Sequence, residues 1–150
     1  VNGLVIQATA IALRAGAKKR EQPVMNFFMS SFREPCYAIM RVVTGLLFLI
    51  HGSQKLFGIP MDPPEAPPFV LYVAGPIQLV GGFLVMLGWF AGPAAFVCSG
   101  LMAFAYWMTH AMNHAIPHLN GGELALLYCF IFLFISARGA GIWSVDGDPN

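Results

Sequence analysis

The sequence predicts an all-α integral membrane protein, an up-and-down bundle of four helices. Hydrophobic residues make up 57% of the chain and charged residues only 10%, and the mean hydropathy is +0.68. A helix needs about 20 mostly apolar residues to cross a hydrocarbon core of ~30 Å. Four segments after Arg33 approach this length, the last being the shortest. They run from Tyr37 to Leu56, Phe69 to Trp89, Pro93 to Met112 and Gly121 to Ala137.

The first 32 residues precede these segments, and we expect them to form a cytoplasmic tail. Their apolar run from Leu4 to Leu13 comes before the basic cluster Lys18–Arg20, the reverse of the order in a secretory signal. We expect the natural chain to start at Met25; an interfacial helix anchored by the basic cluster is the competing interpretation. Residues 33–147 are assigned to the transmembrane domain, and 148–150 to a C-terminal tail.

The first three apolar segments each carry a face of small or polar residues. Membrane helices associate through close packing of small side chains and through buried polar contacts, so we expect these faces to meet inside the bundle. The three faces comprise Arg41, Gly45, Phe48, Gly52 and Lys55; then Gly75, Gln78, Gly81 and Gly82; then Ala95, Ser99, Ala103, Tyr106 and His110.

The connections are short or rich in helix-breaking residues. Five prolines between Gly58 and Pro68 exclude a helix there. The segment from Gly88 to Gly92 predicts a tight hairpin, with Pro93 in the first turn of the next helix. Such connections favour antiparallel neighbours.

The distribution of basic residues predicts the orientation. Five of the eight Lys and Arg residues precede the first span, and Arg138 follows the last, whereas Lys55 is expected on the opposite side. Cytoplasmic flanks of membrane spans carry an excess of Lys and Arg. We therefore expect a multi-pass protein of the bacterial inner membrane with both termini in the cytoplasm.

With this orientation, His51, Lys55, Gln78, His110 and Glu123 gather from the middle of the bilayer to its outer surface. Ionisable groups at membrane depth cost at least ~2.5 kcal/mol each on insertion scales, so they normally face the bundle and have partners. We therefore predict a polar pocket that opens outward. Arg41 stands apart near the inner end, where we expect it to snorkel to the interface.

Three interpretations of this pocket stay open. His110, His114 and His118 have metal-ligand spacing, but Pro117 interrupts their helix face and no Cys, Asp or Glu pattern completes a site, so we assign no metal. A quinone could place its head group against the histidines and Lys55. Alternatively, the polar residues lock the helices in register through Lys55–Glu123 and His–Gln contacts.

The chain resembles the DoxX family of small four-helix bacterial membrane proteins from about Arg33 to Gly147. Arg41 with the following GLLFLIHGSQKLFG, then GPIQLVGGFLVMLGWFAGPAA, His110, NGGELALLY and GAGIWSVDG are similar to its successive signatures. Gln78 departs from the family pattern, which often has glutamate there. An amide can hydrogen-bond but cannot transfer a proton.

The resemblance implies an association with quinone- or thiol-linked redox processes. We therefore expect a membrane subunit or anchor of a redox system, with a membrane or periplasmic partner protein, and His51, Lys55, Gln78, His110 and Glu123 as quinone-binding residues. Whether such a subunit is itself an enzyme is left open. The alternative from another class is a non-catalytic scaffold that recruits a partner; nothing in the sequence favours nucleic-acid binding.

Overall fold

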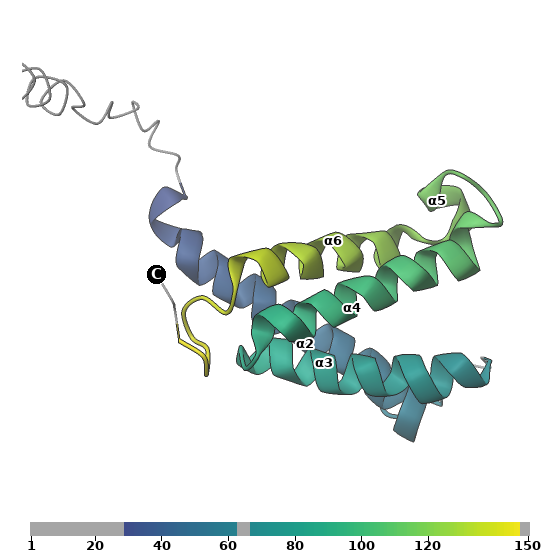
Figure 1. Ribbon diagram of the computed structural model, residues 1–150, viewed down its shortest axis with the longest axis horizontal. Coiled ribbons are helices and arrows are strands. Elements are labelled where there is room, and N and C mark those ends of the chain that lie inside the picture. Colours follow the sequence, from purple (N-terminus) through teal and green to yellow (C-terminus); the bar gives the residue numbers. More distant parts are fainter. Residues whose placement is uncertain (1–28, 63–66, 148–150) are drawn as a thin grey trace, which may run out of the picture. The chain divides into compact units, whose positions relative to one another are not determined.

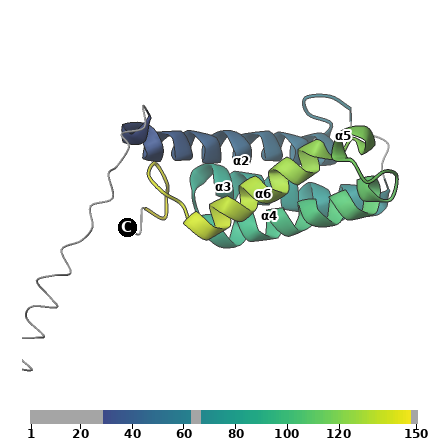
Figure 2. The same cartoon turned by 90° about the horizontal axis from the view of Figure 1, so that it is seen from above.

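The computed structural model describes residues 29–62 and 67–147, where all regular structure is helical (Figures 1 and 2). The predictions for the N-terminal segment up to residue 28, including Met25, and for residues 63–66 and 148–150 lie outside the described residues. η1 is a 3₁₀ turn, and η2 and η3 are π-helical. The elements are η1 (Ser30–Phe32), α2 (Arg33–Phe57), η2 (Val70–Ala74), α3 (Gly75–Leu87), α4 (Ala91–Ala105), η3 (Tyr106–Ala111), α5 (Pro117–Asn120) and α6 (Glu123–Arg138).

Three of the four predicted spans are confirmed as helices long and apolar enough to cross a bilayer. They are Ser30–Phe57, Val70–Leu87 and Ala91–Ala111. The fourth predicted span corresponds to α6, which has 16 residues. At a rise of 1.5 Å per residue it is about 24 Å long, which is shorter than the hydrocarbon core. A fourth crossing by α6 therefore stays a prediction.

The helices form two closely packed pairs, α2 with α3 and α4 with α6 (Figure 1). The backbones of α2 and α3 approach so closely that a Cβ atom built on Gly52 would lie 2.3 Å from the backbone nitrogen of Leu79. A Cβ on Gly82 would lie 2.5 Å from the nitrogen of Leu49. The predicted glycine faces of the first two spans thus meet, as expected for membrane helices.

Side chains join the two pairs along their centre. Phe48 of α2 is completely buried and packs against Phe132 and Tyr128 of α6, with ring centroids 4.6 and 5.4 Å apart. Ser99 of α4 donates a hydrogen bond of 2.8 Å to the carbonyl of Cys129 of α6. The predicted small and polar face of the third span therefore packs against α6.

The two ends of the helices differ. We name one end the closed end. There, residues 139–147 fold back along the α3–α4 turn at residues 88–90. The Val145 N–H donates to the carbonyl of Leu87, and the Asp146 N–H donates to the carbonyl of Gly88. At the opposite end, the open end, α2 finishes, η2 begins and η3 leads into α5 (Figure 2). The ribbons of the two pairs are close together near the closed end and diverge toward the open end (Figure 1).

The two π-helical segments at the open end were not predicted from the sequence. η2 ends two residues before Pro76, which has no backbone N–H and whose ring crowds the carbonyl four residues earlier. A wider turn relieves this conflict, and the Gly75 N–H donates to the carbonyl of Val70, five residues back. η3 contains Thr109, whose hydroxyl donates to the carbonyl of Ala105 at 2.6 Å. The hydroxyl thus competes with a backbone N–H for this carbonyl oxygen.

Candidate functional site

A cavity of about 560 Å³ lies between the two helix pairs toward the open end. Four of the five predicted site residues line it: His51 and Lys55 from α2, Gln78 from α3 and His110 from η3. The rest of its wall is mostly apolar. It comprises Phe48, Pro67, Phe69, Val70, Ala74, Leu101, Met102, Phe104, Ala105, Met108, Thr109, Gly121, Leu124, Ala125 and Tyr128.

Gln78 is the most buried polar residue in this wall. Its side chain is 6% exposed, and its Oε1 atom has no hydrogen-bond partner within the described residues. Leaving a buried polar group unpaired costs roughly 1–3 kcal/mol, so such groups are rare in native proteins. An amide can both accept and donate. Gln78 therefore has a buried amide oxygen with unused hydrogen-bonding capacity in a residue that helps to line the cavity.

His51 and Lys55 are one helical turn apart on α2, and both are half-buried. Within the described residues, the Lys55 ammonium donates only a long hydrogen bond of 3.5 Å, to the carbonyl of His51. The His51 ring stands edge-on to Tyr128, with centroids 6.3 Å apart, and its nitrogens have no hydrogen bond within the described residues. Both side chains can thus still bind a polar ligand group.

His110 is held in one orientation by the loop that follows its helix. Its Nδ1 atom lies 2.9 Å from the carbonyl oxygen of Asn120. Because a carbonyl only accepts, Nδ1 carries the proton, and in the neutral ring Nε2 is then an acceptor. Tyr106 stacks on the ring at 6.4 Å between centroids. His110 is therefore a positioned acceptor in its neutral form.

Glu123 does not lie with the other four predicted residues. It is the first residue of α6 and exposed, and its Oε1 atom is 3.1 Å from Nδ1 of His118. The described residues contain no ion pair between Glu123 and Lys55. The neighbouring residues Gly121 and Leu124 line the cavity, but the Glu123 side chain itself reaches the adjacent α5 rather than α2.

The three histidines with four-residue spacing do not share a helix face. η3 ends at Ala111, and Pro117 starts the separate short helix α5, so His118 does not extend the face of His110. This confirms the effect predicted for Pro117. Across residues 29–62 and 67–147, no group of three His, Cys, Asp or Glu side chains is placed to hold a metal ion.

Arg41 corrects our expectation that this residue snorkels to the interface. Its side chain is 0% exposed, and its guanidinium donates 2.8 Å hydrogen bonds to the carbonyls of Val85 and Met86, in the last turn of α3. It also donates to Trp143 at 2.7 Å and Ile142 at 3.4 Å. The last carbonyls of a helix lack partners within the helix and attract cations. Arg41 therefore ties α2, α3 and the C-terminal segment together.

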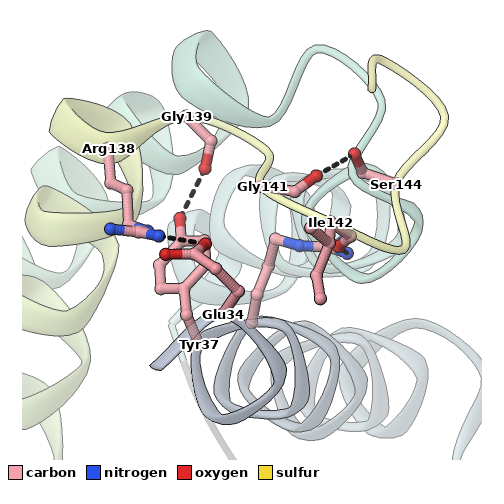
Figure 3. A network of polar contacts seen from close by, with 8 residues as sticks. Glu34, Tyr37, Arg138, Gly139, Gly141, Ile142 and Ser144 are labelled. Atoms are coloured by element: carbon pink, nitrogen blue, oxygen red, sulfur yellow. Dashed lines mark hydrogen bonds and ion pairs between the residues drawn. The ribbon is translucent and has the colours of Figure 1, made fainter. Parts of the chain in front are cut away.

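Further polar contacts close this end of the bundle (Figure 3). The Tyr37 hydroxyl donates to the carbonyl of Gly139, and the Arg138 guanidinium pairs with Glu34 and lies 4.4 Å from the centre of the Tyr37 ring. Asp146 accepts a hydrogen bond of 3.2 Å from the backbone N–H of Ala91, the first residue of α4. These contacts hold together segments that are remote in the sequence, and they line no part of the cavity.

The sequence analysis missed Tyr128 and the apolar rim of the cavity. Tyr128 is buried and contacts both His51 and Phe48. It lies four residues after Leu124, another wall residue, but α6 is apolar on nearly every side, so this spacing did not stand out. Phe69 and Phe104 resembled ordinary lipid-facing residues, and only their contact across the cavity rim distinguishes them.

Comparisons with known proteins identify the family. The chain matches the DoxX family over residues 36–111. It is 38% identical to an uncharacterized protein of Haemophilus influenzae over 125 residues, covering 79% of this chain and 93% of that protein. It is also 36% identical over 55 residues to a Bacillus subtilis protein named "Putative oxidoreductase CatD", covering 33% of this chain and 41% of that protein. No solved structure gives a significant match. The family match, which spans half of the sequence, shows that the chain belongs to the DoxX family.

Proposed function

We propose that this membrane protein binds the ring head group of a quinone or quinol in the open-end cavity and serves as the membrane component of a redox system. The observation that carries the proposal is Gln78, a buried amide with an unpaired oxygen in a cavity that it shares with His51, Lys55 and His110. A chain that needed these residues only to lock helices in register would pair them with one another.

The chemistry of the wall suits both redox states of such a ligand. A quinone carbonyl would accept hydrogen bonds from the Lys55 ammonium or the Gln78 amide N–H, whereas a quinol hydroxyl would donate to the Gln78 oxygen or to a neutral histidine. The apolar remainder of the wall suits the ring. The oxidoreductase name of the Bacillus subtilis relative supports a redox role.

The residues lie at graded depths. Counted from the open ends of their spans, Lys55 is two residues from Phe57 and Gln78 is eight from Val70. At 1.5 Å per residue, these separations correspond to about 3 Å and about 12 Å along the helices. A head group that reaches Gln78 would therefore sit well within the hydrocarbon layer, with Lys55 near its surface.

The proposal includes the membrane arrangement expected from the sequence. α6 crosses as a fourth, short span of an up-and-down bundle, which a bilayer accommodates by local thinning at modest cost. Both termini lie in the cytoplasm of a bacterial cell, so the cavity opens toward the outer side, where a periplasmic or membrane redox partner would exchange electrons with the ligand. Glu123 at that surface pairs with His118 beside the opening.

Co-purification of quinone tests the proposal. The protein is extracted from bacterial membranes in a mild detergent, and bound quinone is measured by absorbance and mass spectrometry. We expect about one quinone per chain for the wild type and several-fold less for Gln78→Leu, Lys55→Ala and His51→Ala. Gln54→Leu is the matched control, because Gln54 lies on α2 between His51 and Lys55 but does not line the cavity.

The outcomes separate clearly. Loss of quinone in the three cavity variants with retention in Gln54→Leu supports the proposal. A wild-type protein that carries no quinone and takes up none when ubiquinone is added contradicts it. Equal occupancy in all variants also contradicts it, since the quinone would then be bound elsewhere.

A further inference from the structure

We infer that the cavity is entered sideways from the lipid, through a door between the two helix pairs that opens when the contacting rings of Phe69 and Phe104 separate. Its ligand is therefore a membrane-dissolved molecule whose apolar tail leaves the cavity at these rings. The inference rests on the proposed function and adds the route of entry and the tail. Its first support is that the aromatic pair spans the two sides of the cavity. Phe69 directly precedes η2, Phe104 is near the end of α4, and their ring centroids are 5.4 Å apart.

The exposure of the two rings indicates what they face. Phe69 is 46% exposed and Phe104 47%, although both line the cavity. By contrast, Gln78, Leu101 and Met102 are all nearly buried in the same wall. The two phenylalanines therefore form a rim with one side toward the cavity and the other toward the surroundings of the protein.

The rim extends from the membrane surface into the lipid, because Phe69 lies one residue before the membrane-capable segment Val70–Leu87, whereas Phe104 lies deeper. Phe104 is seven residues from the end of the membrane-capable segment Ala91–Ala111, or about 10 Å at 1.5 Å per residue. Its neighbour on the same helix face, Met108, is also exposed and also lines the cavity. A ~30 Å core extends well past this depth, so a molecule that leaves between these side chains enters hydrocarbon.

The helix irregularities lie on either side of this door. η2 begins one residue after Phe69, and η3 begins two residues after Phe104. π-Helical turns widen a helix locally and are frequent at functional sites. The end of the cavity near the surface, in contrast, carries Lys55 and His110, with His110 tied to Asn120 by its hydrogen bond. Polar residues at the watery end and an apolar rim at the side match a ligand with a polar ring and an apolar tail.

Ligand exchange tests the door. Protein in lipid nanodiscs is loaded with a long-tailed ubiquinone, and its replacement by an isotope-labelled copy is followed by mass spectrometry. We expect exchange to be about tenfold faster in Phe69→Ala and in Phe104→Ala, and we expect uptake by unloaded protein to be faster as well, which weaker binding alone would not produce. Phe96→Ala is the matched control, because Phe96 lies on α4, is 65% exposed and does not line the cavity.

A second measurement leaves the protein unaltered, so it does not depend on the variants folding. A ubiquinone analogue with a diazirine on its tail is photolysed in complex with the wild type, and the labelled peptides are sequenced. We expect label at Phe69, Phe104 or Met108. Label confined to residues 112–122, at the surface end of the cavity, overturns the lateral route.

The failure of this inference differs from the failure of the proposed function. If Gln78→Leu loses the ligand but the phenylalanine variants exchange it at the wild-type rate, the cavity binds quinone and the door is wrong. If a ubiquinone with one isoprene unit binds as tightly as the long-tailed form, the role of the tail is wrong. If the wild type binds neither molecule, both the inference and the proposed function fail.

Discussion

The closed and open ends of this bundle use buried polar residues in opposite ways. At the closed end, the Arg41 guanidinium makes four hydrogen bonds to carbonyls of its own chain. At the open end, the Gln78 oxygen makes none within the described residues, and Lys55 makes one long contact. A buried polar residue in a membrane protein is thus no evidence of a binding site until its hydrogen bonds have been traced. Arg41 joins three segments through its hydrogen bonds, although its Nε atom also lacks a partner within the described residues, whereas Gln78 lies beside a cavity.

The largest effect is expected at the closed end. Arg41→Ala removes the donor for carbonyls of α3 and of residues 142–143, and should destabilise the protein by about 3–5 kcal/mol, because several buried carbonyls lose their partner at roughly 1–3 kcal/mol each. Arg41→Lys should be intermediate, because an ammonium is a point charge that cannot serve all these carbonyls with fixed geometry. Unfolding in mixed detergent micelles, followed by circular dichroism, measures both. If Arg41→Ala were as stable as the wild type, the hydrogen bonds of Arg41 would not stabilise the closed end, and the contrast with Gln78 would be wrong.

A smaller loss is expected where α2 and α3 touch. Gly52→Ala places a methyl group 2.3 Å from the backbone of Leu79, where no flexible side chain can give way. Overpacking of this kind costs about 1–3 kcal/mol, and it should also displace the α2 wall that carries His51. Gly100→Ala on α4 is the control, because a Cβ there meets nothing within 4 Å. Equal thermal midpoints for the two variants would contradict the close approach of the helices.

Gln78→Leu is expected to separate stability from binding. Replacing an amide whose oxygen is buried without a partner removes its desolvation penalty, so stability should stay level or rise by about 1 kcal/mol. Quinone binding should fall about tenfold, since one hydrogen bond to the ligand is lost. Parallel measurements of the thermal midpoint and of ubiquinone affinity check this. A marked loss of stability would instead favour the register-locking interpretation.

The comparison also explains what the sequence could predict. Glycine spacing on the first two spans predicted their contact, because close backbone approach allows no other residue. The grouping of His51, Lys55, Gln78 and His110 followed from helix periodicity and depth, since His51, Lys55 and His110 lie toward one end of their spans and Gln78 lies near the middle of its span. These features depend on local spacing, which a sequence displays directly.

Contacts that depend on how segments return upon one another could not be predicted. The position of Arg41 near a helix end suggested snorkelling, and only the folding-back of residues 139–147 turns that position into an interior one. The partner of Glu123 similarly depends on how the short helix α5 lies against the start of α6. The rim of Phe69 and Phe104 lies beside two π-helical turns, of which only the one before Pro76 has a cause that can be read from the sequence.

The smallest effect is expected from Glu123, the predicted site residue that lies apart from the rest. Its partner His118 is also exposed, and solvent-exposed ion pairs contribute little to stability. Glu123→Gln should therefore change ubiquinone affinity less than twofold and leave the thermal midpoint unchanged, whereas Lys55→Ala, at the cavity wall, should weaken binding several-fold. If both substitutions weakened binding equally, Glu123 would act on the ligand through Lys55 in the bilayer. The polar residues that bind the ligand would then include residues outside the cavity wall, in the loop around α5.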